Sequence, residues 1–383
     1  MKLLLPVAGL ALFGAGFSGG GSTDVTVIIS GGARGHLSPC GCTSPMSGGL
    51  KRLATIVRAA KTKGSVVWID TGDIIDEPGR QSQLKVETYA ELMGDLGVDA
   101  VAYTRRDRQQ GAGLLASGSP LSGTKWLTPL PGPDEPTMDE KAIHGLTVTT
   151  ADNQSVDFGA EKDSDILVFD GPAGQLDQIK KSHQLEVFAS EGIPTVNGAK
   201  VSPGSNLRGV VVATFRDGRF VSAKVETLEA SIPNDPKADK IYSYYLKRVT
   251  DERLIDKVPR DKDDDYAGSK NCRSCHGVVF HQYLTTRHAG AYKSLEHEGH
   301  QADPDCVGCH VVGLDSTKGF FYEQTPALAQ VGCESCHGAS REHARNPRAV
   351  HLPKVTEQKC LSCHTPSNSP KFNFQLYWKK IKH

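Results

Sequence analysis

The sequence has no excess of charge of either sign. Its 44 Lys and Arg residues equal its 44 Asp and Glu residues, so net charge gives no reason to expect binding to nucleic acid or to an anionic membrane surface. Long apolar runs are missing after the first 22 residues, which excludes a second membrane-spanning helix. Cysteine is missing between Cys42 and Cys272, so no disulfide bond can form within that stretch.

The one long apolar run lies at the N-terminus. Lys2 precedes apolar residues from Leu3 to Phe17 and small residues up to Ser22, which is typical of an export signal. The run is short for crossing a bilayer, although an uncleaved anchor or a buried helix is the alternative. We predict a signal peptide at residues 1–22, a periplasmic or otherwise exported protein, and no transmembrane anchor after processing.

Eight of the ten cysteines lie between Cys272 and Cys363 in four identical C-x-x-C-H frames. This pattern is typical of covalent attachment of c-type haem: the two thiols bond to the porphyrin, and the adjacent imidazole binds the iron. The four frames are Cys272–Cys275–His276, Cys306–Cys309–His310, Cys333–Cys336–His337 and Cys360–Cys363–His364.

Two zinc sites built from the same cysteine pairs are the structural alternative. Zinc would not require a histidine directly after every pair, so the frames favour four c-type haems. The expected partners are redox proteins that give and take electrons. Four haems within about 120 residues leave little room for an ordinary core, so this part should be mainly α-helical and packed around its porphyrins.

Five segments of the C-terminal part resemble one family. They are YAGSKNCRSCH, TTRHAGAYKSL, CVGCHVVGL, VGCESCHGASREH and the final KKIKH, and they are similar to the tetrahaem cytochrome c554 family. The resemblance implies that His288, His343 and His383 bind iron on the face opposite the attached histidine. It also implies that the His310 haem has no protein ligand on that face.

The open face at His310 has rivals in the sequence. His297 and His300 lie just before this frame, and His281 and His351 are also unassigned. An open iron binds or activates a small ligand, so two functions remain: a pure electron carrier, or a reductase or oxidoreductase of a small nitrogen or sulfur oxide. The expected partners therefore include a small molecule at one haem.

The first part of the chain has a different pattern. Short β-rich runs at VTVIIS, SVVWIDTGD, DILVFDG and GVVVATF alternate with helical stretches at Gly49–Lys61 and Gln81–Leu96. This alternation predicts a layered α/β domain with a buried sheet. A helix from Asp235 should present Ile241, Tyr244, Tyr245 and Val249 on one face.

The motifs GGLKRLATIVR and VVWIDTGD resemble the metallophosphoesterase domain of the 5′-nucleotidase family, which binds two metals. Its first metal-binding turn, N-D-x-H-G, is here Gly31–Gly35, with Gly32 and Arg34 in place of Asp and His. Its third turn has become approximately Thr104–Asp107, while Asp73 survives in the second. Arginine repels divalent ions, so the resemblance implies a degenerate domain whose phosphoesterase activity is lost.

Cys40 and Cys42 lie in the Gly/Pro-rich segment HLSPCGCTSPMSGG. They are either idle or oxidised thiols, or a redox dithiol or metal ligand pair that the haems supply with electrons. The predicted division is a metallophosphoesterase-like domain at residues 23–258, a charged linker at 259–265 and a tetrahaem cytochrome domain at 266–383. The first domain would then carry the dithiol or serve as a docking module for a partner.

Overall fold

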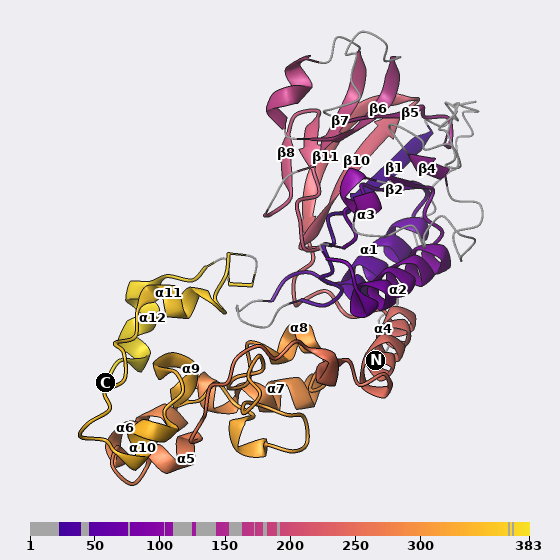
Figure 1. Ribbon diagram of the computed structural model, residues 1–383. Helices are drawn as coiled ribbons and strands as arrows, with labels where there is room; N and C mark the ends of the chain where they lie inside the picture. The colour runs from indigo at the N-terminus through magenta and orange to yellow at the C-terminus, as the bar shows by residue number, and fades with distance from the viewer. Residues whose placement is uncertain are drawn as a thin grey trace, which may run out of the picture.

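The computed structural model has two parts, one built around sheets and one built from short helices (Figure 1). The predicted signal peptide and both Cys40 and Cys42 lie outside the residues that it describes. Those residues are 23–39, 46–75, 77–102, 104–109, 125–127, 143–152, 163–171, 173–178, 182–189, 192–366, 368–369 and 371–383.

A six-stranded sheet forms the centre of the first part, in the order β11-β10-β1-β2-β3-β4. β1 runs parallel to β2, with Ser30 opposite Asp70, and antiparallel to β10. The bounds are β1 Asp24–Ser30, β2 Ser65–Asp70, β3 Ala100–Ala102, β4 Lys125–Leu127, β10 Gly209–Arg216 and β11 Arg219–Thr227.

A second sheet has the order β5-β6-β7-β9-β8. Its strands are β5 Val148–Asp152, β6 Ser164–Asp170, β7 His183–Phe188, β8 Thr195–Asn197 and β9 Lys200–Ser202. The sequence predicted only β6 of this sheet. The other strands are short or partly polar, so alternation within them is too weak to identify them.

Alternate residues of β1 point into two different cores. Ile28 packs with the helices α1 (Leu50–Lys61), α2 (Arg80–Leu96) and α4 (Pro236–Asp251). Val27 and Ile29 pack with residues of the second sheet. Because side chains alternate along a strand, the central sheet is buried on both faces. The predicted layered α/β fold is therefore confirmed, with one layer of helices and two sheets.

Helix α4 begins as the sequence predicts but buries a different tyrosine. The Asp235 side chain accepts hydrogen bonds from Lys237 N and Ala238 N, and Pro236 opens the helix. Tyr242 is buried, whereas Tyr244 is 57% exposed. Helix α4 packs against both the first domain and the C-terminal part. Its buried surface is therefore wider than one helix face and includes Tyr242.

The C-terminal part is mainly α-helical, as predicted. Its small core gathers Tyr266, Tyr292, Val307, Val312 and Phe320. Its helices are short: α5 Ser269–Cys272, α6 Gly277–Leu284, η4 Arg287–Gly290, α7 Ala291–Glu298, α8 Pro304–Val307, η5 Pro326–Leu328, α9 Cys333–His337, α10 Arg341–Arg345, α11 Glu357–Leu361 and α12 Phe374–Ile381.

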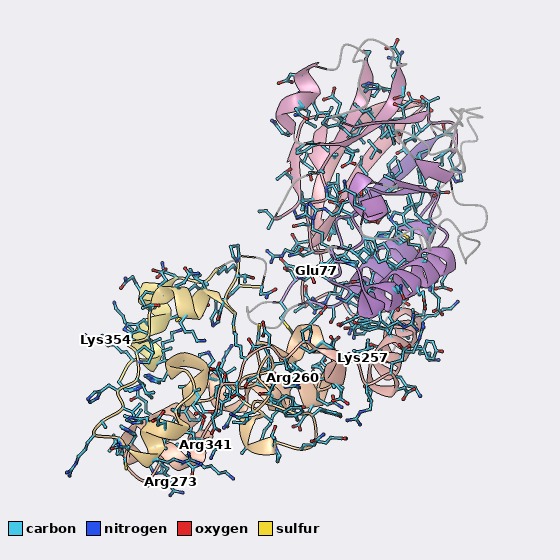
Figure 2. The ribbon with its side chains drawn as sticks, viewed as in Figure 1. Glu77, Lys257, Arg260, Arg273, Arg341 and Lys354 are labelled. Carbon is cyan, nitrogen blue, oxygen red and sulfur yellow. The ribbon has the colours of Figure 1, made fainter. Side chains whose placement is uncertain are left out.

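The joint between the two parts lies in the 3₁₀ helix η3 (Leu254–Lys257). Leu254 packs into the core of the first part, whereas its neighbour Ile255 packs into the core of the helical part. Arg260, which Figure 2 shows beyond Lys257 in the helical part, stacks on Phe321 with 3.8 Å between the guanidinium carbon and the ring centre. The connection is therefore packed on both sides.

The charged segment 259–265 is more than a solvated spacer. Lys262 N donates to Asp315 O at 3.2 Å, and Ser316 Oγ donates to Asp264 O at 2.8 Å. Asp263 pairs with Lys318 at 2.9 Å. These bonds attach the segment to the loop after the second C-x-x-C-H frame. Within the described residues, no helix combines the length and the apolar character needed to cross a membrane.

The cap of α4 gives the first prediction. Replacing Asp235 by Ala should lower the free energy of unfolding by about 1–2 kcal/mol, because two helix N–H groups and Arg58 lose their acceptor. Replacing it by Asn, which also caps helices, should lower it less. Urea denaturation followed by circular dichroism measures both variants; equal stability of the Ala variant and the parent would contradict this role.

Candidate haem sites

Each C-x-x-C-H frame is folded into a tight helical turn. The histidine N–H donates to the carbonyl of the first cysteine in two frames, from His276 to Cys272 at 2.8 Å and from His364 to Cys360 at 2.9 Å. His310 N donates to Val307 O at 2.8 Å. Helix α9 contains the whole frame from Cys333 to His337. Each turn thus places both thiols and the imidazole close to one another.

Three of the frame histidines face one of the histidines that the family resemblance singled out. The ring centres of His276 and His343 are 6.3 Å apart, with 27° between the ring planes. Those of His364 and His288 are 6.3 Å apart, and those of His337 and His383 are 5.7 Å apart. The partners come from η4, α10 and the C-terminal residue, which are far from the frames in sequence.

This spacing fits an iron between the rings of each pair. Metal–imidazole bonds are about 2 Å long and the bonded nitrogen lies roughly 1 Å from its ring centre, so two imidazoles on opposite faces of one iron have centres about 6 Å apart. Rings in direct van der Waals stacking would be closer. The thiol pairs and the ring pairs together therefore suit a c-type haem with two histidine ligands.

The second ring nitrogen of several of these histidines is held by an acceptor. His343 Nδ1 lies 2.7 Å from Val350 O, and His364 Nδ1 lies 3.1 Å from Ser369 Oγ. Such contacts fix the ring and leave Nε2 to bind metal. Burial also lowers the pKa of several rings, which favours the neutral form that binds iron; these are His288, His310, His337 and His364.

His310 differs from the other three frame histidines. Its Nδ1 lies 2.7 Å from Ala291 O, so its ring is held by a backbone acceptor as a ligand's ring should be. In the part of the chain that the structure describes, however, no histidine ring is paired with it in the way that His343 is paired with His276. The face opposite His310 therefore lacks the partner that the other frames have.

The four rival histidines are engaged or exposed. Burial lowers the pKa of His310 most, and the charge of His300 also lowers it. The ring centre of His300 nevertheless lies 5.7 Å from that of Tyr242, and its Nδ1 faces the Cys306 thiol at 3.5 Å. His297 is 85% exposed and pairs with Glu298. Two further rivals are exposed, namely His281 and His351.

The four frames lie against one another in pairs. The Cys333 thiol raises the pKa of Cys272, and the Cys309 thiol lowers the pKa of Cys363, so the thiols of each pair lie close together. The first frame therefore lies beside the third, and the second beside the fourth. Groups attached at these thiols would be close enough to exchange electrons.

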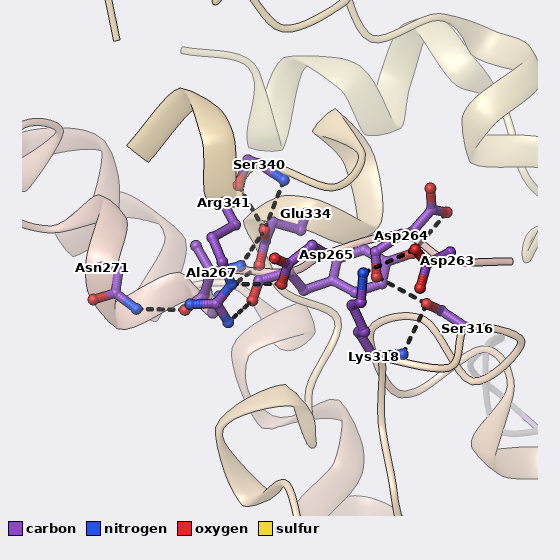
Figure 3. Close-up of polar contacts among 12 residues, drawn as sticks. Asp263, Asp264, Asp265, Ala267, Asn271, Ser316, Lys318, Glu334, Ser340 and Arg341 are labelled. Atoms are coloured by element: carbon purple, nitrogen blue, oxygen red, sulfur yellow. Dashed lines mark hydrogen bonds and ion pairs between the residues drawn. The ribbon is translucent and has the colours of Figure 1, made fainter. Parts of the chain in front are cut away.

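Glu334, inside the third frame, ties three segments together (Figure 3). Its carboxylate is buried and accepts hydrogen bonds from Ala267 N at 2.8 Å, Gly268 N at 2.7 Å and Ser340 Oγ at 2.6 Å. Arg341 strengthens this network through Asp265 at 2.5 Å. The start of the helical part is thereby fixed to the frame of His337.

The position of the family's metal-binding turns is occupied by ion pairs in the first part. Arg34 lies 3.4 Å and Arg106 lies 3.6 Å from the Asp73 carboxylate. Asp107 accepts from Asp73 N at 2.9 Å and Ile74 N at 2.8 Å, and burial raises its pKa to about 7. Cations already neutralise Asp73 and backbone donors occupy Asp107, an arrangement unsuited to two divalent ions.

Comparison with known proteins agrees with the cytochrome resemblance. Residues 271–338 match the family described as Cytochrome c554 and c-prime, and a domain of this family implies a multihaem electron carrier with c-type haems. Cytochrome c-554 of Nitrosomonas europaea is 37% identical over 95 residues, which are 21% of this chain and 40% of that protein. The chain thus matches less than half of this relative's length.

The solved structures that match this chain include three proteins. A 5′-nucleotidase precursor from Thermus thermophilus has a TM-score of 0.47 at 14% identity, over 72% of this chain and 68% of its own. NAD nucleotidase from Haemophilus influenzae has a TM-score of 0.45 at 12% identity, over 65% of this chain and 64% of its own. Sulfate thiohydrolase SoxB from Thermus thermophilus has a TM-score of 0.43 at 12% identity, over 61% of this chain and 62% of its own. Scores below 0.5 say nothing about chemistry.

Sequence reasoning missed two residues near the frames. Glu334 lies between Cys333 and Cys336 of its frame. This position inside the frame was the only sign in the sequence that it has a structural role. Asp303 lies three residues before Cys306. It is the N-cap of α8, and Pro304 is the first residue of that helix, which is a recognisable capping pattern. The partners of both lie in distant segments, so the sequence could not show what they hold.

Glu334 gives the second prediction. A Gln side chain offers one acceptor oxygen where Glu offers two, so Glu334→Gln should leave a buried N–H without an acceptor and cost about 1–3 kcal/mol. Hydrogen exchange at Ala267 and Gly268 should speed up. Glu342→Gln, on the exposed side of α10, is the matched control; equal exchange in both variants would refute the role.

Proposed function

We propose that this protein is an exported tetrahaem c-type cytochrome that carries electrons through four covalently bound haems. One haem is attached at each C-x-x-C-H frame, with His276, His310, His337 and His364 as the attached ligands. His343, His383 and His288 close the opposite faces of the first, third and fourth haems. The observation that carries this proposal is the set of three imidazole pairs with ring centres 5.7–6.3 Å apart.

The haem of His310 is the proposed open site. Its attached histidine has the backbone contact that a ligand should have, and none of its four rivals forms a ring pair with it among the described residues. An open iron position binds a small ligand, so a small nitrogen or sulfur oxide is the class of molecule that suits it. Without such a substrate the protein works as an electron carrier, and reduction of the ligand at this haem is the second candidate function.

The first domain does not require a chemical role in this proposal. Its metal-binding turns are filled by Arg34 and Arg106, so hydrolysis of phosphate esters is the least supported function. Its expected roles are recognition of a redox partner and control of the cytochrome domain on which it packs. Export and cleavage near residue 22 remain part of the proposal.

Mass spectrometry and electron paramagnetic resonance of the oxidised protein test this function. The intact mass should show four haems, and about one haem in four should give a high-spin ferric signal that cyanide or nitric oxide removes. Four low-spin signals without any response to these ligands would mean that a histidine closes the His310 haem. Fewer than four haems would contradict the assignment of the frames.

The pairing of ligands is tested by single substitutions. His288→Met should alter the spectrum and raise the potential of one haem only, because a thioether ligand favours the ferrous state. The affected signal should be the one missing from a Cys360→Ala, Cys363→Ala double variant, which lacks the His364 haem. His281→Met is the control and should change nothing. A change in a different haem would reassign His288.

A further inference from the structure

The two domains meet at the helix that carries the second frame. In Figure 1, α8 lies at the end of the cytochrome domain next to α2. Gln81 Nε2 of α2 donates to Asp303 Oδ1 at 2.6 Å, and Tyr245 Oη of α4 donates to Asp303 Oδ2 at 3.4 Å. Lys85 of α2 forms an ion pair with Asp305. The first domain therefore contacts the residues directly before Cys306.

Asp303 is the centre of this contact. Its side chain is only 5% exposed. It also caps α8 by accepting from Asp305 N at 3.1 Å. Its hydrogen-bond partners in the first domain, Gln81 and Tyr245, carry no charge, while Lys85 is engaged by Asp305. Asp303 thus places a carboxyl group inside the joint between the domains.

This carboxyl group lies next to a haem attachment thiol. His300 Nδ1 is 3.9 Å from Asp303 Oδ2 and 3.5 Å from Cys306 Sγ. One ligand atom each of His300, Asp303 and Cys306 lies within 4.8 Å of the others. Such a trio could hold a metal ion by itself. Cys306, however, belongs to a complete C-x-x-C-H frame, and a sulfur bonded to a porphyrin is no longer a thiolate ligand.

We propose that Asp303 is a positioning residue that lowers the reduction potential of the haem attached at Cys306, and that Gln81 and Tyr245 of the first domain hold it in place. A fixed buried anion beside a porphyrin stabilises the ferric over the ferrous state, since charge and burial around a haem are levers on its potential. This inference rests on the proposed haem at Cys306 but not on whether its iron is open.

The joint also gives the first domain a function in electron transfer. Tyr242 and Tyr245 belong to the core of the first domain, and they contact His300 and Asp303 of the cytochrome domain. Any partner or ligand that shifts α2 or α4 would move groups that touch the haem environment. The first domain is therefore the element through which this one haem can be adjusted separately from the other three.

A redox titration of the full-length protein tests the proposal with Asp303→Asn. Asparagine still caps a helix, and its one oxygen can still accept from Asp305 N and from Gln81. The substitution therefore removes the charge and loses only the bond from Tyr245, which is 3.4 Å long. The haem whose potential His310→Met alters should titrate at a higher potential in Asp303→Asn, with the other three unchanged. Asp235→Asn, at a buried helix cap of the first domain, should leave all four unchanged.

The possible outcomes separate the two proposals. Four haems by mass and an unchanged potential in Asp303→Asn, with a shift only in Asp303→Ala, would overturn the role of the charge and leave a structural cap. Four haems that all shift together would overturn the specific link to Cys306. A protein with no haem at Cys306 and Cys309, and with zinc bound instead, would overturn both the inference and the tetrahaem function.

Discussion

The spacing between paired imidazole rings is the constraint on which the helical part depends. Ring centres 6.3 Å apart, as in His276 and His343, leave room for an iron and its two bonds but not for ordinary stacking. To hold three such gaps open, the chain has to bring η4, α10 and its last residue to frames distant in sequence. The proposed haem ligation would require the short helices and loops of this part to present ligands to several separate centres.

Unlike the paired imidazole rings, which are held apart, the two domains pack directly against each other at their joint. Leu254 and Ile255 are neighbours in sequence and belong to different cores, so the connection cannot turn freely without exposing one of them. Residues 263–265 are attached to the cytochrome domain by hydrogen bonds and ion pairs. A partner that binds the first domain would therefore bind a domain that packs against the residues next to the second C-x-x-C-H frame.

In the first domain, ion pairs and backbone hydrogen bonds occupy the turns after β2 and β3. Arg34 and Arg106 neutralise Asp73, and Asp107 serves as an acceptor for the backbone of the same turn. The carboxylates that remain are used to stabilise the loops after β2 and β3. Protein donors thus satisfy both carboxylates in these turns.

The sequence determined the class of protein, because its main signals are local. Four C-x-x-C-H frames predict haem attachment from five residues each, and the alternation of apolar runs and helical stretches predicts the layered domain. The cap at Asp235 could also be predicted, because aspartate is a common helix cap and Pro236, which suits the first helical position, follows it directly. Tertiary structure decided the rest: which histidine faces which frame, that Tyr242 and not Tyr244 is buried, and that Asp303 meets Gln81. These contacts join residues dozens to hundreds of positions apart, and their geometry depends on how whole elements pack, which no local pattern encodes.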